Sequence, residues 1–385
     1  MRSKGTNAAT ILRLMQEYGP ISRARLARQI GTSPTTIGSV VGKLLKRAYV
    51  IEGPSGSSNG GRPPVLLELN RNRFVMGVEV SATDISVIVA SLSGTKVAHT
   101  SVPTHGAKGY RLIEHLLEVL ARARDLTQAS ALTGIGVATP GLVDDEAGIV
   151  RSADAIEWSD VPLRAIVEER FRLPTHVENN ANAAVVGEGR YGAARGARNL
   201  LYVNLGVGVG AGLVIDGSLY RGSSKMAGEL GHLVVDPDGP RCHCGRYGCL
   251  EALVGTDALT ARARDSAVAA GGPSGEPVDL DTIARALAAG DSGAVALCEN
   301  AGVWIGTALA GVINLMNPEL IILGGPTTRL GPRLLDAVRQ TLERRTLALP
   351  LAGVKIVAPA LRSDSAAMGA AVLALDSAWM AEEQT

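Results

Sequence analysis

The feature that most constrains the fold is a short run of cysteines in the middle of the chain. Three of the four cysteines lie within eight residues, and a histidine precedes the first of them by ten positions. Thiolate sulfur and imidazole nitrogen are the ligands that zinc prefers, and four of them form a closed tetrahedral structural site. Neighbouring glycines allow the chain to fold back so that the sulfurs converge. The predicted zinc ligands are His232, Cys242, Cys244 and Cys249.

Two other interpretations of these cysteines are weaker. Free cysteines often pack as small buried hydrophobic residues, but packing rarely needs three of them so close together beside a histidine. A disulfide suits secreted proteins, whereas the N-terminus has basic residues without an apolar signal core. The sequence contains no uninterrupted run of about 18 apolar residues, so we predict no membrane-spanning helix. We therefore expect a cytoplasmic protein with reduced thiols, and we expect Cys298 to be buried in a helix over 294–301.

Charge is distributed unevenly along the chain, although the net charge is only +1. Residues 1–70 contain ten lysines and arginines against three acidic residues, and the remainder is slightly acidic. A small basic segment joined to a larger acidic one is typical of a DNA-binding head on a sensor or enzyme body. At 385 residues the chain is also too long for one ordinary domain. We therefore predict one domain over 1–70 and a second over 71–385.

Residues 1–70 have the pattern of a winged helix-turn-helix. Helices are predicted over 7–18 and 23–30, and Ser33-Pro34 supplies the N-cap and first position of a third. Strands over 49–52 and 65–69 flank a Gly/Ser-rich loop, the wing. The third helix would enter the major groove, where hydroxyl groups reach base edges and basic groups contact phosphates, and the wing arginine would enter a minor groove. The predicted DNA-binding residues are Ser33, Thr35, Thr36, Ser39, Lys43, Arg47 and Arg62.

The remaining chain contains a loosely repeated pattern. Residues 74–90 predict a strand, a turn and a strand, followed by a third strand over 95–102. Residues 200–219 repeat this order around a glycine-rich turn, and an alanine-rich helix is predicted over 365–380. The pattern indicates two related α/β lobes. We assign the lobes to 71–185 plus a C-terminal helix over 363–382, and to 186–362.

The residues around the cysteines resemble the zinc signature of the ROK family (repressor, open reading frame, kinase). Here the signature is Gly-Glu-Leu-Gly-His over 228–232, then Cys-x-Cys-Gly-x-x-Gly-Cys-x-Glu over 242–251. The two halves resemble the duplicated actin-like, ribonuclease-H-like fold of sugar kinases. The resemblance implies that the four predicted residues are the family's zinc ligands and that the final helix crosses back onto the first lobe. It also implies a ligand site in the cleft between the lobes. The sugar-binding residues that it implies are Gly141, Asn179, Glu229, His232 and Glu251.

Two departures from the family pattern argue against kinase activity. In the family's Glu-Asn-Asp-Ala-Asn motif the aspartate is the general base toward the sugar hydroxyl, and Asn180 occupies that position here. An amide has no useful basicity near neutral pH, although it can still hydrogen-bond a sugar. In the phosphate-binding turn, Ser81 and Ala82 replace two glycines, and a Cβ at each position obstructs close approach of a phosphate.

We therefore expect a sugar-responsive transcriptional regulator that is not an enzyme, most simply a repressor of carbohydrate-metabolism genes. It would bind an operator as a homodimer or homotetramer, and a sugar would act by binding two conformations with different affinity. A sugar kinase with an appended DNA-binding head is the first alternative. The second is a sensor domain that serves only as a scaffold for dimerisation. Ala155 leaves this second alternative open, because the family has a sugar-contacting asparagine there, although Ser152 or Asp154 could replace that contact.

Overall fold

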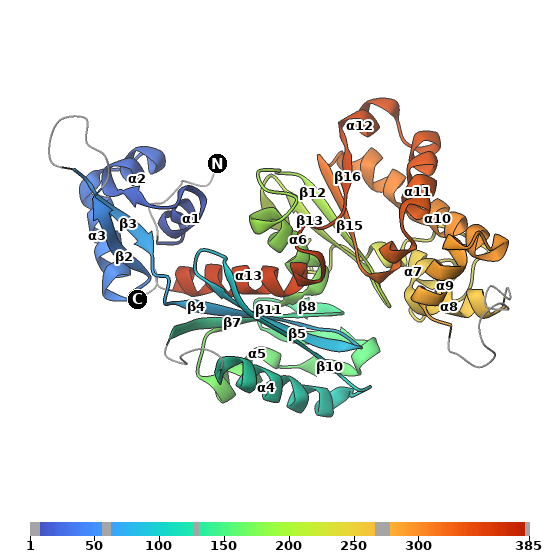
Figure 1. The fold of residues 1–385 in the computed structure, drawn as a ribbon, viewed down its shortest axis with the longest axis horizontal. Helices are drawn as coiled ribbons and strands as arrows, with labels where there is room; N and C mark the ends of the chain where they lie inside the picture. Colours follow the sequence, from blue (N-terminus) through green and yellow to red (C-terminus); the bar gives the residue numbers. More distant parts are fainter. Residues whose placement is uncertain (1–7, 56–62, 126–130, 266–277, 382–385) are drawn as a thin grey trace. The chain divides into compact units, whose positions relative to one another are not determined.

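The computed structural model describes residues 8–55, 63–125, 131–265 and 278–381 (Figure 1). The chain forms two compact units, which meet in the sequence at Glu178/Asn179 and at Ala366/Ala367. The first unit therefore contains the N-terminal part of the chain and its final helix, and the second contains the region between them. The assignment of residues 1–70 to a domain of their own remains a prediction.

The N-terminal part of the first unit packs three helices against a small sheet of order β1-β3-β2. Ser22 and Ser33 cap α2 and α3 by accepting backbone N–H groups, as their sequence positions predicted. The two-residue strand β1 was not predicted, because it is too short to have a period. The elements are α1 (Ala8–Tyr18), β1 (Ile21–Ser22), α2 (Arg23–Ile30), α3 (Pro34–Lys46), β2 (Val50–Ser55) and β3 (Val65–Leu69).

The rest of the first unit is built on a five-stranded sheet of order β11-β7-β4-β5-β6. Its strands are β4 (Phe74–Val80), β5 (Asp84–Ser91), β6 (Lys96–Pro103), β7 (Leu132–Thr139) and β11 (Thr175–Asn179). Helices α4 (Gly109–Asp125) and α5 (Leu163–Phe171) lie on one side of it, and α13 (Ser365–Ala381) lies on the other (Figure 1). A smaller sheet holds β8 (Leu142–Asp144), β9 (Ile149–Ala153) and β10 (Trp158–Val161).

Two strand glycines explain how α13 approaches the sheet so closely. A Cβ at Gly77 would lie 2.0 Å from the carbonyl oxygen of Ala367, and one at Gly136 would lie 1.9 Å from that of Ala370. Both helix residues belong to α13, which is rich in alanine. Small residues on both surfaces therefore allow backbone to pack on backbone, as the resemblance to the sugar-kinase fold implied for this helix.

The second unit repeats the strand order of the first as β14-β13-β12-β15-β16. Its strands are β12 (Leu200–Leu205), β13 (Val209–Ile215), β14 (Ser218–Tyr220), β15 (Leu320–Gly324) and β16 (Lys355–Val357). In each unit an antiparallel three-stranded meander comes first, and the strand after it pairs in parallel with the first strand of the meander. The duplication predicted from two hairpins is therefore confirmed by complete sheets.

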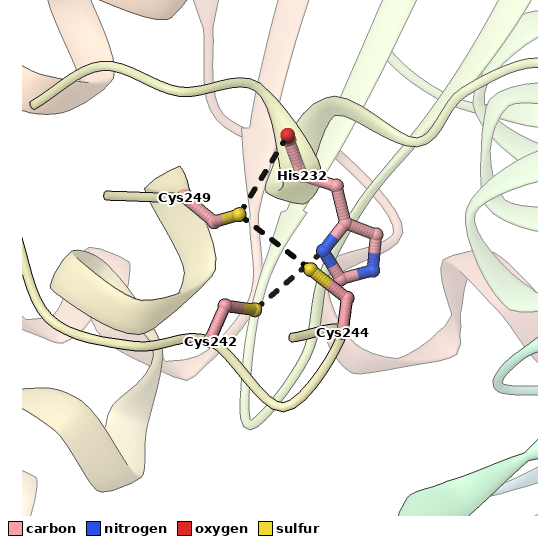
Figure 2. A group of neighbouring side chains, drawn as sticks. All are labelled: His232, Cys242, Cys244 and Cys249. Atoms are coloured by element: carbon pink, nitrogen blue, oxygen red, sulfur yellow. Dashed lines mark hydrogen bonds between the residues drawn. The ribbon is translucent and has the colours of Figure 1, made fainter. Parts of the chain in front are cut away.

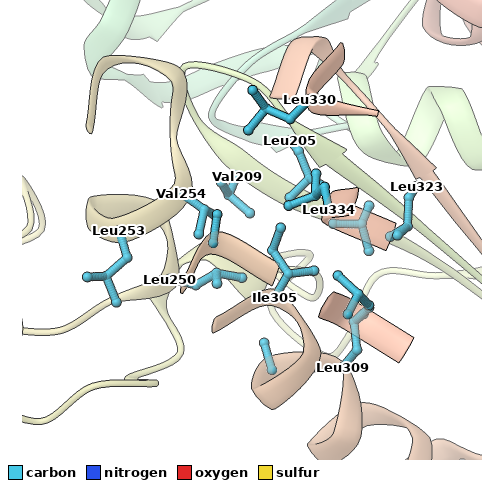
Figure 3. Close-up of a cluster of buried hydrophobic side chains, with 14 of the residues drawn as sticks. Leu205, Val209, Leu250, Leu253, Val254, Ile305, Leu309, Leu323, Leu330 and Leu334 are labelled. Atoms are coloured by element: carbon cyan, nitrogen blue, oxygen red, sulfur yellow. The ribbon is translucent and has the colours of Figure 1, made fainter. Parts of the chain in front are cut away.

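Helices cover the second sheet and enclose its core. They are α6 (Asn180–Tyr191), α7 (Leu250–Val254), α8 (Thr256–Asp265), α9 (Leu280–Ala288), α10 (Ser292–Met316), α11 (Pro332–Arg345) and α12 (Ala348–Gly353). Leu205 and Val209 from the sheet pack with Leu250 of α7 and with Ile305 and Leu309 of α10 (Figure 3).

Helix α10 is long and apolar enough to cross a membrane by length and composition alone. However, 56% of the residues in its apolar window are buried within the protein. Leu309 and Ile313 are fully buried in the core that α10 shares with α11. Cys298 is also fully buried in this helix, as predicted, and burial raises the pKa of its thiol to about 11. These features are those of a core helix.

A buried carboxylate on α6 organises the segment that leads into α13. Glu188 is fully buried and accepts N–H groups from Ala193, Ala360 and Leu361 and the hydroxyl of Ser365. Four donors compensate a charge that would otherwise be costly to bury. Glu188 thus fixes the start of α13 to the second unit.

Candidate metal centre and polar site

The four predicted metal ligands converge at one point in the second unit. His232 ends a short 3₁₀ turn over Leu230–His232, and Cys249 is the N-cap of α7. Cys242 and Cys244 lie on the loop between them (Figure 2). Gly248 allows this loop to close, because its φ is +70° and a Cβ there would lie 1.6 Å from the carbonyl oxygen of Asp236.

The four ligand atoms lie close enough together to hold one metal ion. Cys244 Sγ and Cys249 Sγ are 3.7 Å apart, and Cys242 Sγ lies 3.7 Å from His232 Nδ1. All four ligand atoms lie within 4.8 Å of one another. Ordinary Zn–S and Zn–N bond lengths place tetrahedral ligand atoms about 3.6–3.8 Å apart. A sulfur separation of 3.7 Å is also far beyond a disulfide bond of about 2.05 Å. The cluster can therefore hold a metal ion.

The thiol groups need a cation to become ligands together. Burial raises the pKa of Cys249 to about 12 and also raises that of Cys242. Hydrogen bonding from the backbone of Arg246 lowers the pKa of Cys244. A bound metal ion is what would keep two desolvated thiols deprotonated near neutral pH, since metal binding displaces their protons.

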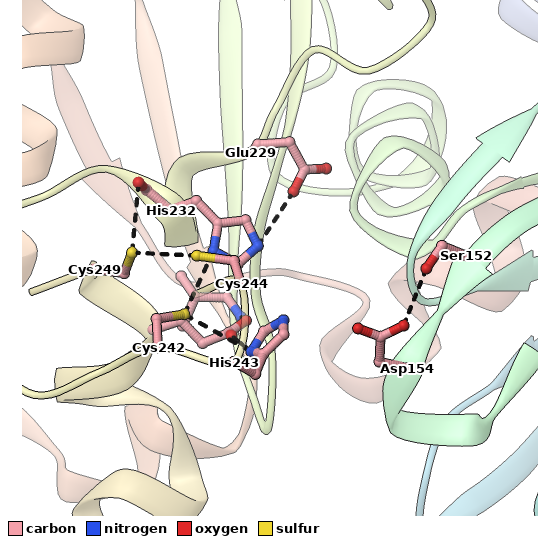
Figure 4. Close-up of polar contacts among 10 residues, drawn as sticks. Ser152, Asp154, Glu229, His232, Cys242, His243, Cys244 and Cys249 are labelled. Atoms are coloured by element: carbon pink, nitrogen blue, oxygen red, sulfur yellow. Dashed lines mark hydrogen bonds and ion pairs between the residues drawn. The ribbon is translucent and has the colours of Figure 1, made fainter. Parts of the chain in front are cut away.

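His232 has a distinct partner for each ring nitrogen. Its Nδ1 faces Cys242, whereas its Nε2 lies 3.8 Å from Glu229 Oε2 (Figure 4). A carboxylate beside the second nitrogen is the usual support for a metal-bound histidine. Burial raises the pKa of Glu229; the nearby Glu251 carboxylate also raises it, and His232 opposes the shift. The structure thus brings the predicted sugar ligands Glu229 and Glu251 next to His232, a member of the metal cluster.

Glu251 is held from two sides. Its Oε2 accepts the backbone N–H of Val209 at 2.9 Å, in the glycine-rich turn between β12 and β13. Its Oε1 lies 2.8 Å from Nδ1 of His243, the residue between the first two cysteines. The Glu251 side chain is only 13% exposed. Sequence reasoning missed His243, although its place between two predicted ligands already tied it to this loop.

Asn179 and Asn180 begin α6 at the end of β11. Asn179 caps the helix, because its side chain accepts N–H groups from Ala181 and Asn182. Asn180 Oδ1 also accepts the N–H of Ala181, at 2.9 Å. Both side chains are partly exposed. Their carbonyl oxygens thus have structural tasks here, and their amide NH₂ groups are the parts suited to donate to a ligand.

The predicted sugar residues of the first unit lie around the turn after β7. Gly141 has φ +86°, and a Cβ there would lie 2.0 Å from the carbonyl oxygen of Ser152. Glycine is therefore required by packing at this position, whatever binds there. Ser152 donates to Asp154 at 3.0 Å (Figure 4), and Ala155 is exposed beside them.

The turn between β4 and β5 contains Ser81 and Ala82, which the sequence resemblance aligned with a phosphate-binding turn. Asp84 accepts the hydroxyl groups of Ser81 at 2.7 Å and of Thr83 at 2.8 Å on one carboxylate oxygen. Its other oxygen lies 3.4 Å from the hydroxyl of Ser101. The turn is closed by its own side chains around a negative charge. Nothing in the sequence pattern had indicated a role for Asp84.

The predicted DNA-contacting side chains of the N-terminal part share one property, which is exposure. Those on or next to α3 are all exposed: Ser33, Thr35, Thr36, Ser39, Lys43 and Arg47. The buried face of α3 is formed by Ile37, Val41 and Leu44. Arg62 lies outside the described residues.

Comparison with known proteins extends these observations. Residues 75–377 match the family described as ROK. The chain belongs to the ROK family. A relative named xylose repressor, from Caldicellulosiruptor bescii, is 30% identical over 95% of this chain and 94% of its own length.

Two solved ROK structures are informative about the extent of the match. A ROK family transcriptional regulator, described as a homologue of the Escherichia coli Mlc protein, superposes with a TM-score of 0.85 at 27% identity. It covers 98% of this chain and 97% of its own. A ROK family glucokinase from Streptomyces griseus, in complex with glucose and AMPPNP, has a TM-score of 0.70 and 31% identity. It covers 78% of this chain and 99% of its own.

Proposed function

We propose that this chain is a sugar-responsive, DNA-binding transcriptional regulator of carbohydrate metabolism that represses its target genes in the cytoplasm. The observation that carries the proposal is the extent of similarity. The xylose repressor and the ROK family transcriptional regulator match over 95% and 98% of the chain, whereas the glucokinase matches over 78%. The basic N-terminal part thus accompanies regulators and not the kinase.

We assign the N-terminal part as a winged helix-turn-helix. The capped helices α2 and α3, the turn at Gly31 with its φ of +76°, and the β2–β3 hairpin support this assignment. The exposed hydroxyl and basic residues of α3 have the chemistry for base edges and phosphates respectively. A homodimer or homotetramer would present two such heads to a palindromic operator.

Contacts within the first unit support a way in which ligand binding could change the position of the N-terminal DNA-binding head. Arg13 of α1 donates from Nε and Nη2 to the two carboxylate oxygens of Asp376 on α13, at 3.3 and 2.9 Å. Gln16 donates to the carbonyl oxygen of Leu92 at 2.6 Å. On α13, Ser377 lies 3.1 Å from His176 of β11, the strand that ends at Asn179. A ligand at Asn179 could thus bias the position of α13 and, through Arg13, that of the head.

We propose zinc as the metal of the cysteine cluster and a structural role for it. Four closed ligands from side chains suit zinc that holds a loop together, with no open position for catalysis. Once bound, zinc would order the loop that carries Glu229, His232 and Glu251. These three residues, with Gly141, Asn179 and Asn180, are the proposed sugar ligands.

We further propose that the protein has no kinase activity. Asn180 cannot accept the proton of an attacking sugar hydroxyl. The Asp84 carboxylate in the β4–β5 turn would repel the phosphates of a nucleotide, and the Ser81 and Ala82 side chains would obstruct them. Two separate changes thus remove two separate requirements of phosphoryl transfer.

The decisive experiment measures binding to labelled DNA from upstream of the gene, at fixed salt, with a panel of monosaccharides and their phosphates. We expect one sugar to weaken DNA binding at least tenfold. The same preparation, tested for sugar-dependent release of ADP from ATP, should show no turnover. Tight DNA binding unaffected by the panel would favour the scaffold alternative, and robust ADP release would favour the kinase.

A further inference from the structure

We propose that His243 is a positioning residue for the effector site, which orients Glu251 toward a neutral polyhydroxylated ligand. The inference rests on the proposed function, since it assigns the task of one residue within the proposed sugar site. Its observation is the contact between His243 Nδ1 and Glu251 Oε1 at 2.8 Å.

A glutamate side chain has several rotatable bonds. If the protein does not already hold the side chain in place, the ligand must order it, and the entropy lost weakens binding. Glu251 avoids this loss because each carboxylate oxygen already has one donor. The β12–β13 turn supplies the N–H of Val209, and the metal loop supplies His243. Each oxygen keeps lone-pair capacity for a further donor.

The position of His243 is itself set by the metal ligands. Cys242 and Cys244 flank it, and its ring packs edge-on against His232 with centroids 5.2 Å apart. When these ligands are fixed by a metal, the backbone on both sides of His243 is fixed as well. Its side chain then connects the order of the metal loop to the orientation of Glu251, although His243 is not among the four ligands.

This arrangement also selects the ligand by charge. Glu251 and Glu229 are both carboxylates close to one another, so this side of the site accepts hydroxyl hydrogens and repels phosphate. A phosphorylated sugar would have to direct its phosphate elsewhere. The chemical class that fits is a neutral sugar with adjacent hydroxyl groups.

The test compares His243→Asn with His243→Leu, whose side chains both branch at Cγ. The asparagine amide can donate from near the Nδ1 position, whereas leucine cannot donate. Binding of D-xylose, D-glucose and N-acetylglucosamine is measured by calorimetry, and zinc content is measured on the same samples. We expect His243→Leu to weaken the sugar that the wild type binds by about tenfold, the loss of one such hydrogen bond. His243→Asn should remain within about threefold of wild type, and both variants should keep one zinc per chain.

A double-mutant cycle with Glu251→Gln sharpens the result, because His243→Leu should have little further effect once the carboxylate is gone. Wild-type affinity in His243→Leu would overturn the inference and leave the proposed function intact. Equal loss in both variants with zinc retained would overturn it too, since the donor would not matter. If the wild type itself binds none of these sugars or their phosphates, the proposed function fails and takes this inference with it.

Discussion

The β4–β5 turn of the first unit and the β12–β13 turn of the second occupy the same place in two sheets of the same order, yet they differ in chemistry. The first is closed by hydroxyl groups around the Asp84 carboxylate. The second keeps its glycines and offers a backbone N–H to Glu251. The difference teaches that two copies of one turn can carry different chemistry, with a carboxylate held by hydroxyl groups in the first and glycines beside the Glu251 carboxylate in the second.

Removal of the metal should have the largest effect and should act on the second turn only. With Cys249→Ala or after chelation, we expect zinc content near zero and a melting temperature lower by about 5 °C or more. Amide hydrogen exchange should rise around Val209, because Glu251 loses its support, and stay unchanged around Ser81. Unchanged exchange at both turns would mean that the metal loop does not hold the second turn.

Two glycine substitutions separate a tightly packed glycine of β13 from a glycine of the second turn. A Cβ at Gly212 would lie 2.2 Å from the carbonyl oxygen of Ala181, whereas the nearest atom to one at Gly206 is 3.5 Å away. We expect Gly212→Ala to lower the free energy of unfolding by about 3 kcal/mol. Gly206→Ala is the matched control and should change it by less than about 1 kcal/mol. Urea denaturation measures both, and equal effects would contradict this division of tasks.

Two of the contacts of α1 join it to the rest of the first unit. One is with Leu92, which directly follows β5 at the end of the β4–β5 hairpin away from its turn. The other is with Asp376 on α13. Breaking Arg13–Asp376 with Arg13→Ala should cost about 1 kcal/mol or less, since the arginine is 48% exposed and the pair is screened by solvent. The sugar-dependent change in DNA affinity should nevertheless shrink several-fold. The charge swap Arg13→Asp with Asp376→Arg should restore part of it. A full response in Arg13→Ala would exclude this contact from the route.

The smallest effect is expected from reopening the first turn. A variant with Ser81→Gly, Ala82→Gly and Asp84→Ala should bind AMPPNP weakly in calorimetry. Binding of AMPPNP by the wild type should be undetectable in the same measurement. It should still transfer no phosphate to sugar, because Asn180 is unchanged. Tight nucleotide binding by the wild type would show that the closed turn is no barrier.

Much of the architecture could be predicted from local patterns. Ser22, Ser33 and Pro34 predicted helix starts because capping depends on neighbouring residues alone, and three cysteines with His232 predicted a cluster because ligand types and spacing are local as well. The apolar period also predicted the strands of both hairpins.

The contacts missed by sequence reasoning depend on folding in three dimensions. Arg13 and Asp376 are 363 positions apart, and no sequence period joins them. The Asp84 network needs the geometry of its turn, and Glu188 accepts donors from two segments, at Ala193 and over 360–365. His243 is a different case, because its neighbours were visible but its partner, Glu251, depends on how the loop closes.

The path of α13 has a consequence for how the protein is made. The strands that carry Gly77 and Gly136 emerge from the ribosome long before the helix that covers them. During synthesis this surface of the first sheet stays uncovered until the whole second unit has been translated. Glu188 likewise lacks the donors of the segment before α13 until that segment has been made. Arg13 likewise meets Asp376 only at that late stage. A chain that ends before α13 would therefore lack this contact and would leave Gly77 and Gly136 without the helix that covers them.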